Sequence, residues 1–492
     1  MKNIMNSIVL LAAFFFAVAC YKDKGNYDYK DVVEIEISGI KDEYTVYVGT
    51  DMKIPVEITC KKGNPGNLSY EWRINGKIVS REKDLDIPVS FPVMPGLYSD
   101  FSVIDNETGI KTLKLFKVNV STEFFDGWLI LSDAGDHSEL SYLRNDGKLY
   151  PCIYQQLNKE KLGAGATLMK EHWIPFASPT GEVFIAVSQG PNYSVDLDGN
   201  SLFRMVYTKD EFLGGVPADF SPQNLDCVIN WDYMISNGKL YTRYVNRTYD
   251  AQYHEGFFVN GAVPGDYKLL PLTLRGNAVS SREIIGFDEK TKSYKLLREG
   301  TMSDFNYTDD PGKAFVPYNM NKTLVAGGPI STQVPEDYFV TFLKGDDGKH
   351  YVHRFAFKGW GNKKYTSISE VVFPSPELIR PDTKWAICNG RPYAYFSSGN
   401  RLYSYNCEGN RVKELKGSIL SGKINALAVC RTDPQKLAVA YENASDKSKS
   451  DFVLLDISVI GDGAVIENTK KEAAFGMVVA IIYKVGNQWV LY

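Results

Sequence analysis

The stretch SNGKLY at residues 236–241 decides the fold class of the larger part of this chain. A strand-like segment precedes it, and the residues after the glycine open with large apolar or aromatic side chains. Asn-Gly is the pair preferred in two-residue hairpin turns, because both central residues of such a turn need positive φ. The stretch therefore predicts two antiparallel strands joined by a tight turn at residues 237–238.

The same pattern returns along the chain from Gly127 onward. Its copies recur at intervals of roughly 40 to 57 residues, the range expected when each repeat is a four-stranded propeller blade. TKSY at 291–294 is a turn candidate without glycine. The clear copies are NDGKLY at 145–150 and SGNRLY at 398–403, and the weaker ones are DGNSLF at 198–203, DGKHY at 347–351 and GNQW at 486–489.

This repetition predicts that residues 123–492 form a β-propeller, with seven blades favoured and eight as the alternative. A closed ring explains how so much antiparallel strand avoids exposed edges. The segment QWVLY at 488–492 is expected to close the ring by pairing with WLIL at 128–131. Irregular spacing keeps a tandem of further sandwiches open, whereas the absence of a helical period disfavours α/β enzyme folds.

Residues 32–122 show a different arrangement of strands. About eight short segments alternate apolar and polar residues, which describes a β-sandwich. Asn75-Gly76 predicts a hairpin turn, and Pro95-Gly96 marks another turn. The whole chain is thus predicted to be all-β, with a sandwich followed by a propeller.

The first residues predict export and lipid attachment. Lys2 and the apolar run from Ile8 to Ala19 form a signal peptide over residues 1–19, too short to span a membrane. Small residues precede Cys20, so we expect cleavage before Cys20 and lipid on its side chain. Residues 20–31 are polar and aperiodic, as in an extended tether.

Composition excludes several partners and sites. The net charge is -4 and Lys and Arg are scattered, so nucleic acid is not an expected partner. Six cysteines follow Cys20 at wide spacing without a CxxC pair, and we expect small buried hydrophobes rather than disulfides or metal ligands.

No motif in the sequence predicts catalysis, a cofactor or a metal. His350 and His353 lie three apart in a predicted strand and so point to opposite faces. Asp196 and Asp198 resemble the start of a calcium loop, but Tyr207 stands where a bidentate glutamate would be needed. A plain turn is the favoured interpretation at that position.

Aromatic residues near loop-like segments are the candidates for ligand binding. Flat aromatic faces suit sugar rings or extended peptides. The alternative for each residue is packing between blades. The candidates are Trp173, Tyr193, Tyr253 and Trp360.

The predicted sandwich resembles the PKD family of immunoglobulin-like domains. The residues that carry the resemblance are Tyr70-x-Trp72, Asn75-Gly76, Pro95-Gly96-x-Tyr98 and Val103-x-Asp105. The resemblance implies that Trp72 and Tyr98 are core residues. It also implies a spacing or adhesion module rather than a catalytic one.

Taken with the start CYKDKGNYDY at 20–29, the chain resembles the PKD-like lipoproteins of Bacteroidetes nutrient-utilisation loci. The resemblance implies a lipid-anchored outer-membrane protein at the cell surface that accompanies a TonB-dependent transporter and its lidding lipoprotein. It implies a binder of glycans or oligopeptides. A propeller hydrolase or lyase, and a docking subunit without its own ligand, are the alternatives.

Overall fold

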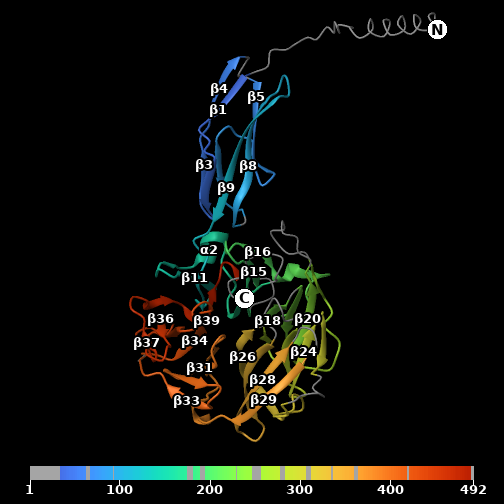
Figure 1. Ribbon diagram of the computed structural model, residues 1–492, viewed down its shortest axis with the longest axis vertical. Coiled ribbons are helices and arrows are strands. Elements are labelled where there is room, and N and C mark those ends of the chain that lie inside the picture. The colour runs from blue at the N-terminus through green and yellow to red at the C-terminus, as the bar shows by residue number, and fades with distance from the viewer. Residues whose placement is uncertain are drawn as a thin grey trace, which may run out of the picture. The chain divides into compact units, whose positions relative to one another are not determined.

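The computed structural model describes residues 34–488 except 63–66, 92, 174–180, 189–193, 229, 246–255, 277–282, 306–311, 334–335, 359–363 and 418–419. The described residues are mostly β-strand and form two compact units (Figure 1). The first unit consists mainly of residues up to 120, and the second begins at residue 121.

The first unit is built from antiparallel strands, as its sequence predicts. A five-stranded sheet has the order β2-β9-β8-β5-β6, and the pairs β1-β4 and β3-β7 complete the unit. The strands are β1 Glu34–Ser38, β2 Glu43–Tyr47, β3 Asp51–Ile54, β4 Glu57–Lys62, β5 Leu68–Ile74, β6 Lys77–Ser80, β7 Leu85–Pro88, β8 Met94–Asp105 and β9 Lys111–Ser121.

Trp72 is the centre of this unit's core, as predicted. Its side chain is fully buried, its ring centroid lies 4.4 Å from that of Phe101, and its Nε1 donates a hydrogen bond to the Glu82 carbonyl. The prediction that Tyr98 is a core residue is wrong, because 78% of its side chain is exposed. Successive residues of a strand point to opposite faces, and on β8 the inward face is the one that carries Phe101.

The second unit consists of seven antiparallel sheets that follow one another along the chain. Most have four strands, and the third has three among the described residues. The first sheet has the order β12-β11-β10-β39, with β10 Gly127–Asp133, β11 Ser138–Arg144, β12 Leu149–Tyr150 and β39 Met477–Lys484.

The next three sheets run from β13 to β25. The second contains β13 Ala166–His172, β14 Glu182–Val187, β15 Val195–Asp198 and β16 Arg204–Tyr207; the third contains β18 Pro222–Val228, β19 Trp231–Ser236 and β20 Lys239–Tyr244; the fourth contains β22 Leu274–Arg275, β23 Glu283–Asp288, β24 Ser293–Arg298 and β25 Thr301–Asp304.

The last three sheets complete the unit. The fifth contains β26 Lys322–Gln333, β27 Glu336–Gly345, β28 His350–Lys358 and β29 Lys364–Val372; the sixth contains β30 Trp385–Ile387, β31 Tyr393–Ser398, β32 Arg401–Asn406 and β33 Arg411–Glu414; the seventh contains β34 Ile424–Val429, β35 Lys436–Glu442, β36 Ser450–Asp456, β37 Ala464–Val465 and β38 Lys471–Phe475.

The sheets form a ring that the C-terminal strand closes. β39 pairs with β10 and so joins the end of the second unit to its beginning. It lies beside β34 of the seventh sheet and beside β13 of the second, so the ring has no gap at the junction. This is a seven-bladed β-propeller, and Figure 1 shows its sheets arranged around a common centre.

The closing strand differs from the one predicted. We expected residues 488–492 to pair with 128–131, but the pairing partners of Trp128 and Ile130 are Tyr483 and Ile481 on β39. Residues 489–492 lie outside the described residues. The partner strand at 128–131 was predicted correctly, and the closing strand lies several residues earlier.

An apolar layer lies between every two neighbouring sheets, and the layers confirm the closed ring. Alternate residues of each strand face opposite neighbours, so each sheet contributes to two layers. Taken in order around the ring, the layers contain Leu129 and Val183, Phe184 and Met234, Tyr233 and Ile284, Phe287 and Phe339, Val340 and Phe396, Tyr395 and Val439, and Phe452 with Trp128.

The repeated stretches form hairpin turns within the sheets, except GNQW at 486–489, which follows the last strand β39 and ends outside the described residues. Asn237 and Gly238 have φ of 49° and 73° and connect β19 to β20, as their sequence predicts. Helices are few: α2 Ile153–Asn158 and the 3₁₀ turns η3 Thr208–Glu211 and η4 Pro376–Leu378, while β17 Phe212–Leu213 and β21 Phe258–Val259 form a small parallel pair.

Two further observations bear on the sequence predictions. Cys60, Cys152, Cys227, Cys388, Cys407 and Cys430 are all free, and the last four are buried, which agrees with the expected role as small hydrophobes. Within the described part of the chain, no helix has the length and apolar character needed to cross a membrane.

Candidate functional site

A cavity of about 1010 Å³ lies at the centre of the propeller. The first strands of the second to sixth sheets line it, together with β39 of the first sheet and the loop after β34 of the seventh. Because every sheet reaches this cavity, side chains that are far apart in the sequence meet there. The central channel, as we call this cavity, is the candidate functional site.

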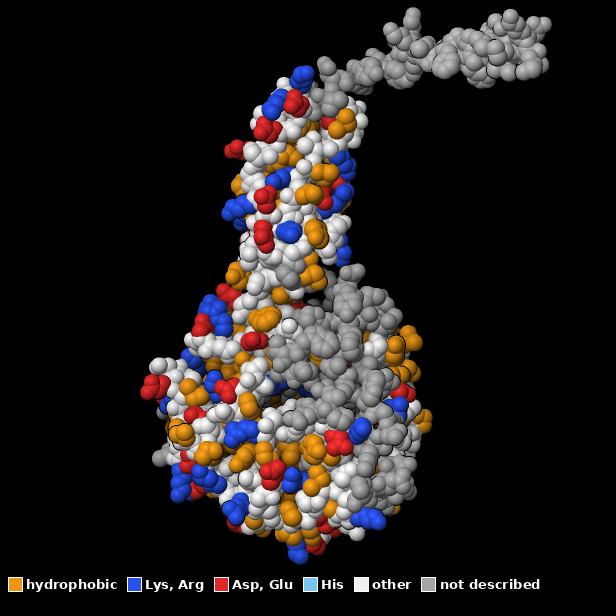
Figure 2. Space-filling view, viewed as in Figure 1, with side chains coloured by type: hydrophobic (Ala, Val, Ile, Leu, Met, Phe, Trp, Pro, Cys, Tyr) orange, Lys and Arg blue, Asp and Glu red, His pale blue; other side chains and the backbone are white. Residues whose placement is uncertain are grey.

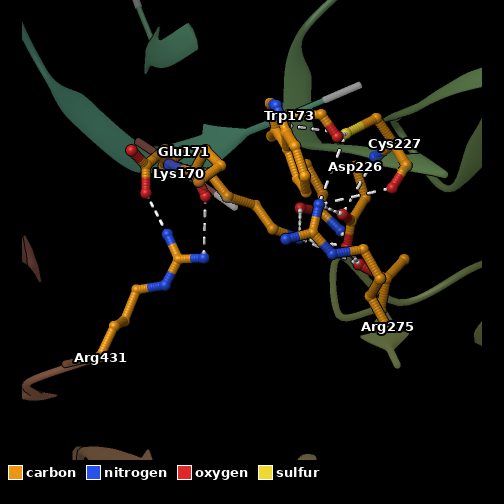
Figure 3. A network of polar contacts seen from close by, with 10 residues as sticks. Lys170, Glu171, Trp173, Asp226, Cys227, Arg275 and Arg431 are labelled. Carbon is orange, nitrogen blue, oxygen red and sulfur yellow. Dashed lines mark hydrogen bonds and ion pairs between the residues drawn. The ribbon is translucent and has the colours of Figure 1, made fainter. Parts of the chain in front are cut away.

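One wall of the central channel is a network of polar side chains from β13, β18 and the residues at β22 (Figure 3). The Lys170 ammonium lies 2.6 Å from an Asp226 carboxylate oxygen and also donates to Asn224 and Thr273 at 3.1 Å each. The Thr273 hydroxyl donates to the same Asp226 oxygen at 2.7 Å. This network holds the Lys170 side chain in one orientation.

Arg275 approaches Asp226 from the next sheet. Its Nη1 lies 3.4 Å from the other carboxylate oxygen of Asp226 and 3.4 Å from the Cys227 carbonyl oxygen. Burial alone would raise the pKa of Asp226, but the charges of Lys170 and Arg275 lower it below its ordinary value. Asp226 therefore remains ionised between the two cations.

A second ion pair faces the same cavity. The Arg431 guanidinium, from the loop after β34, binds the Glu171 carboxylate through Nη1, and its Nη2 donates to the Gln488 side chain at 3.2 Å (Figure 3). Arg431 belongs to the seventh sheet and Glu171 to the second. The first sheet lies between these two, so the ion pair connects the sheets on either side of it.

The opposite wall of the channel is apolar, and two of its lining residues are glycines. It comes from β26 and β30, with Val325, Pro329 and Ile387 as lining side chains. Gly327 and Gly328 add no side chains there, and a Cβ on Gly328 would approach the Ile387 Cβ to 3.2 Å. The first strands of the fifth and sixth sheets are thus closely spaced.

The exposed charge in the central channel is positive. The side chains of Lys170, Arg275 and Arg431 are 27%, 16% and 29% exposed. Their carboxylate partners Asp226 and Glu171 are only 2% and 5% exposed. A ligand in the channel would meet ammonium and guanidinium groups on one side and an apolar surface on the other, and both carboxylates are already engaged with cations.

Of the four predicted ligand-binding residues, only Trp173 lies within the described residues, and it does not line this channel. Trp173 is 1% exposed, and its backbone N–H donates to Cys227 Sγ at 3.1 Å, so its ring lies inside the protein. Tyr193, Tyr253 and Trp360 lie outside the described residues, and their role stays a prediction. The predicted lipid-attachment residue Cys20 also lies outside them.

The sites that the sequence disfavoured have structural explanations. His353 is buried with Nε2 2.7 Å from a Glu370 oxygen, while Asp198 accepts the backbone N–H groups of Asn200 and Ser201 in a turn. Sequence reasoning missed Lys170, Arg275 and Arg431. The available signal was the charged pair Lys170-Glu171 inside an otherwise strand-like segment.

Comparison with known families bears on the first unit. Residues 20–165 match the model of the PKD-like family, which covers the whole described first unit and the beginning of the propeller. This confirms the resemblance of the first unit to PKD-like domains. A search of curated proteins found no match.

Among solved structures, a quinonprotein alcohol dehydrogenase-like protein from Bacteroides thetaiotaomicron matches at 11% identity and a TM-score of 0.38, over 90% of this chain and 97% of that one. The β-propeller domain of Cps50 (Swd1) from Myceliophteria thermophila matches at 10% identity and a TM-score of 0.37, over 65% and 93%. The sheet topology described above, rather than these distant likenesses, establishes the propeller.

Proposed function

We propose that this protein is a lipid-anchored surface protein of the outer membrane whose propeller binds glycan or oligopeptide nutrients in its central channel. In this proposal it serves as an accessory to a TonB-dependent transporter and its lidding lipoprotein. Lipid on Cys20 provides the anchor, and residues 20–31 provide the tether.

The observation that carries the binding proposal is the asymmetry of the central channel. Partly exposed Arg275 and Arg431 face a wall of Val325, Pro329 and Ile387 across a cavity of about 1010 Å³. Sugars and peptides both present polar edges and apolar faces, and pockets that bind them combine the two kinds of surface. Guanidinium groups bind carboxylates in bidentate geometry, so acidic glycans and acidic peptides are the favoured members of both classes.

The described surface that Figure 2 shows carries mixed charge. Figure 2 shows acidic and basic side chains interspersed over the described surface in view, without an extended area of one charge. The net charge of -4 also gives no general attraction for anions. Binding of an acidic ligand would therefore depend on the channel itself.

Ligand capture tests the proposal. The chain without its signal and with Cys20 replaced would be screened against glycan arrays and peptide pools, and hits measured by isothermal titration. We expect the double variant Arg275→Gln with Arg431→Gln to lose about tenfold or more in affinity, because each removes a charge-assisted contact. Arg401→Gln, in an exposed arginine outside the channel, is the matched control and should bind like the unchanged protein.

Two results would contradict the binding proposal. Failure of every glycan and peptide pool to bind would remove its basis. Full affinity in the double arginine variant would place the ligand elsewhere. Capture of the transporter by a protein that binds no ligand would support the docking alternative instead.

The anchor is tested separately. In cells that carry the native chain, we expect metabolic labelling with a fatty acid to mark the protein and fractionation to recover it with the outer membrane. Cys20→Ala should lose the label and move the protein into soluble fractions. Protease treatment of intact cells reports the face of the membrane, and a native protein that is fully protected would contradict surface exposure.

A further inference from the structure

The layer between the second and third sheets is divided into an apolar half and a charged half. The apolar half contains Phe184, Leu225 and Met234. The charged half consists of buried side chains that are each no more than 5% exposed: His172, Glu182, Asp196, Glu211, Cys227, Asp232 and Arg243. Burying charged groups costs free energy unless they are paired or bind a metal. The cluster of buried charged side chains in this layer therefore needs an explanation.

Three of these residues come together through the strand register. Cys227 on β18 and Asp232 on β19 are direct cross-strand partners, so their side chains lie on the same face of the third sheet. His172 ends β13 of the second sheet and faces them. A His172 ring nitrogen, Cys227 Sγ and an Asp232 carboxylate oxygen all lie within 4.8 Å of one another.

In each of these three residues, the surrounding groups leave one possible metal-ligand atom available to the cluster. His172 Nε2 lies 3.0 Å from Asp196 Oδ1 and 3.2 Å from a Glu182 oxygen, which assigns the ring proton to Nε2. Nδ1 of His172, fully buried, has no hydrogen-bond partner among the described residues. A ligating histidine that donates its other ring N–H to a carboxylate is the usual arrangement at protein metal sites.

Asp232 and Cys227 are arranged in the same way. Arg243 Nε donates to Asp232 Oδ2 at 2.7 Å, and the other oxygen, Oδ1, has no partner within the described part of the chain. Cys227 Sγ accepts the Trp173 backbone N–H at 3.1 Å and has Arg275 Nη1 3.4 Å away, so donors and a cation surround the sulfur.

We propose that this cluster binds Zn²⁺ through His172 Nδ1, Cys227 Sγ and Asp232 Oδ1. A mixed N, S and O donor set is characteristic of zinc, and tetrahedral coordination would bring the ligand atoms to roughly 3.5 Å apart, a modest contraction. A water molecule completes the coordination. Binding releases the Cys227 thiol proton to solvent, and the hydrogen bond from Sγ to the Trp173 carbonyl is replaced by the metal bond.

His172, Cys227 and Asp232 are each fully buried, so bulk solvent does not reach the site. The metal is therefore structural: it joins the second and third sheets beside the polar wall of the central channel. The other possible occupant of this space is a proton on His172 Nδ1, shared toward Asp232. The placement of Cys227 Sγ within 4.8 Å of both His172 and Asp232 has no role in that arrangement.

Metal analysis of the purified chain tests the proposal. After chelator treatment, titration with Co²⁺ should saturate at about one equivalent and produce the near-ultraviolet charge-transfer band of a cobalt thiolate, as a tetrahedral site with a cysteine ligand requires. Zn²⁺ should displace the cobalt and raise the melting temperature, and a chelator should reverse that rise.

Matched variants identify the ligands. Cys227→Ser should lose the charge-transfer band, whereas Cys407→Ser, at a buried cysteine of the sixth sheet, should keep it. Should Cys227→Ser fail to fold, the titration of the unchanged protein still decides, because a protein that takes up no cobalt or shows no thiolate band overturns the proposal. A band that persists in Cys227→Ser, or uptake that Glu182→Gln abolishes while Cys227→Ser retains it, would also overturn it.

Discussion

Two layers between neighbouring sheets of the propeller are packed with different kinds of side chain. Between the fifth and sixth sheets, Phe342 lies with its ring centroid 4.3 Å from Trp385 and 5.3 Å from Tyr405, and the buried hydrophobic residues of the layer form one cluster. Between the second and third sheets, half of the layer is charged. The aromatic layer shows that neighbouring sheets need no buried charge to pack, so the charged half indicates a site rather than a packing requirement.

The largest expected effect comes from breaking the charged layer. Arg243 binds both Asp232 and Glu211 and is fully buried with them. Arg243→Leu leaves two carboxylates without this cation and should lower the free energy of unfolding by about 3–5 kcal/mol. Urea unfolding followed by tryptophan fluorescence measures this loss in the free energy of unfolding. Arg401→Leu, at an exposed arginine, is the control.

The loss in Arg243→Leu should depend on pH. Carboxylates left without the guanidinium have raised pKa values and take up protons as the pH falls, so the variant should recover part of the loss at acidic pH. A loss below about 1 kcal/mol at neutral pH would mean that water reaches these carboxylates and that the layer is not dry.

A buried lysine in the first sheet should have a smaller effect. Burial lowers the pKa of Lys484 to about 8, and its Nζ donates to the Phe125 carbonyl at 2.6 Å. Between this folded value and the ordinary value of 10.5, the unfolded chain binds more protons, so this group makes stability rise with pH across that window.

Lys484→Met removes that pH dependence. Below pH 8 the variant avoids burying a charge and should be more stable than the native chain by on the order of 1–3 kcal/mol, as one pKa unit corresponds to about 1.4 kcal/mol. The difference should shrink as the pH rises toward 10. Thermal unfolding over this range measures it, and a constant difference would contradict the assignment.

The aromatic layer should respond without pH dependence. Phe342→Leu shortens a side chain that is 4% exposed and should lower the free energy of unfolding by about 1–2 kcal/mol. Because burial raises the pKa of Tyr405, the titratable ring among these contacts, above its ordinary value, this group stays neutral at both pH values and we expect the loss to be the same at pH 5 and pH 8. A strongly pH-dependent loss would show that charge also matters in this layer.

The smallest expected effect on stability is at the central channel. The Arg431 side chain is 29% exposed and Gln keeps a donor toward the buried Glu171, so Arg431→Gln should lower the free energy of unfolding by about 1 kcal/mol, less than the loss of a fully buried cation. Its effect on ligand affinity should be larger than its effect on stability. A variant that unfolds readily would show that Arg431 supports the ring rather than a ligand.

The fold could be predicted from the sequence because its signals are local. Asn237-Gly238 specifies a turn through its own φ preferences, and Trp128 lies in a strand whose apolar pattern is complete in itself. The closing strand was misplaced because either C-terminal segment could pair with residues 128–131. Tyr98 was misplaced because an aromatic residue beside a turn does not reveal which face of the strand is buried.

The sites could not be predicted because their residues meet only in space. Lys170, Arg275 and Arg431 come from three different sheets, and His172, Cys227 and Asp232 from three strands in two sheets. Their spacing matches no motif, and the sequence predicted neither a metal nor a channel. Only the cross-strand register and the closure of the ring bring these side chains together.

The contrast between the two layers rests on the occupant of the charged one, and anomalous diffraction at the zinc absorption edge measures that occupant directly. Crystals of the chain grown with Zn²⁺ should show a single strong peak within bonding distance of His172 Nδ1, Cys227 Sγ and Asp232 Oδ1. An empty cluster, or a peak on the other side of His172 between Glu182 and Asp196, would contradict this account.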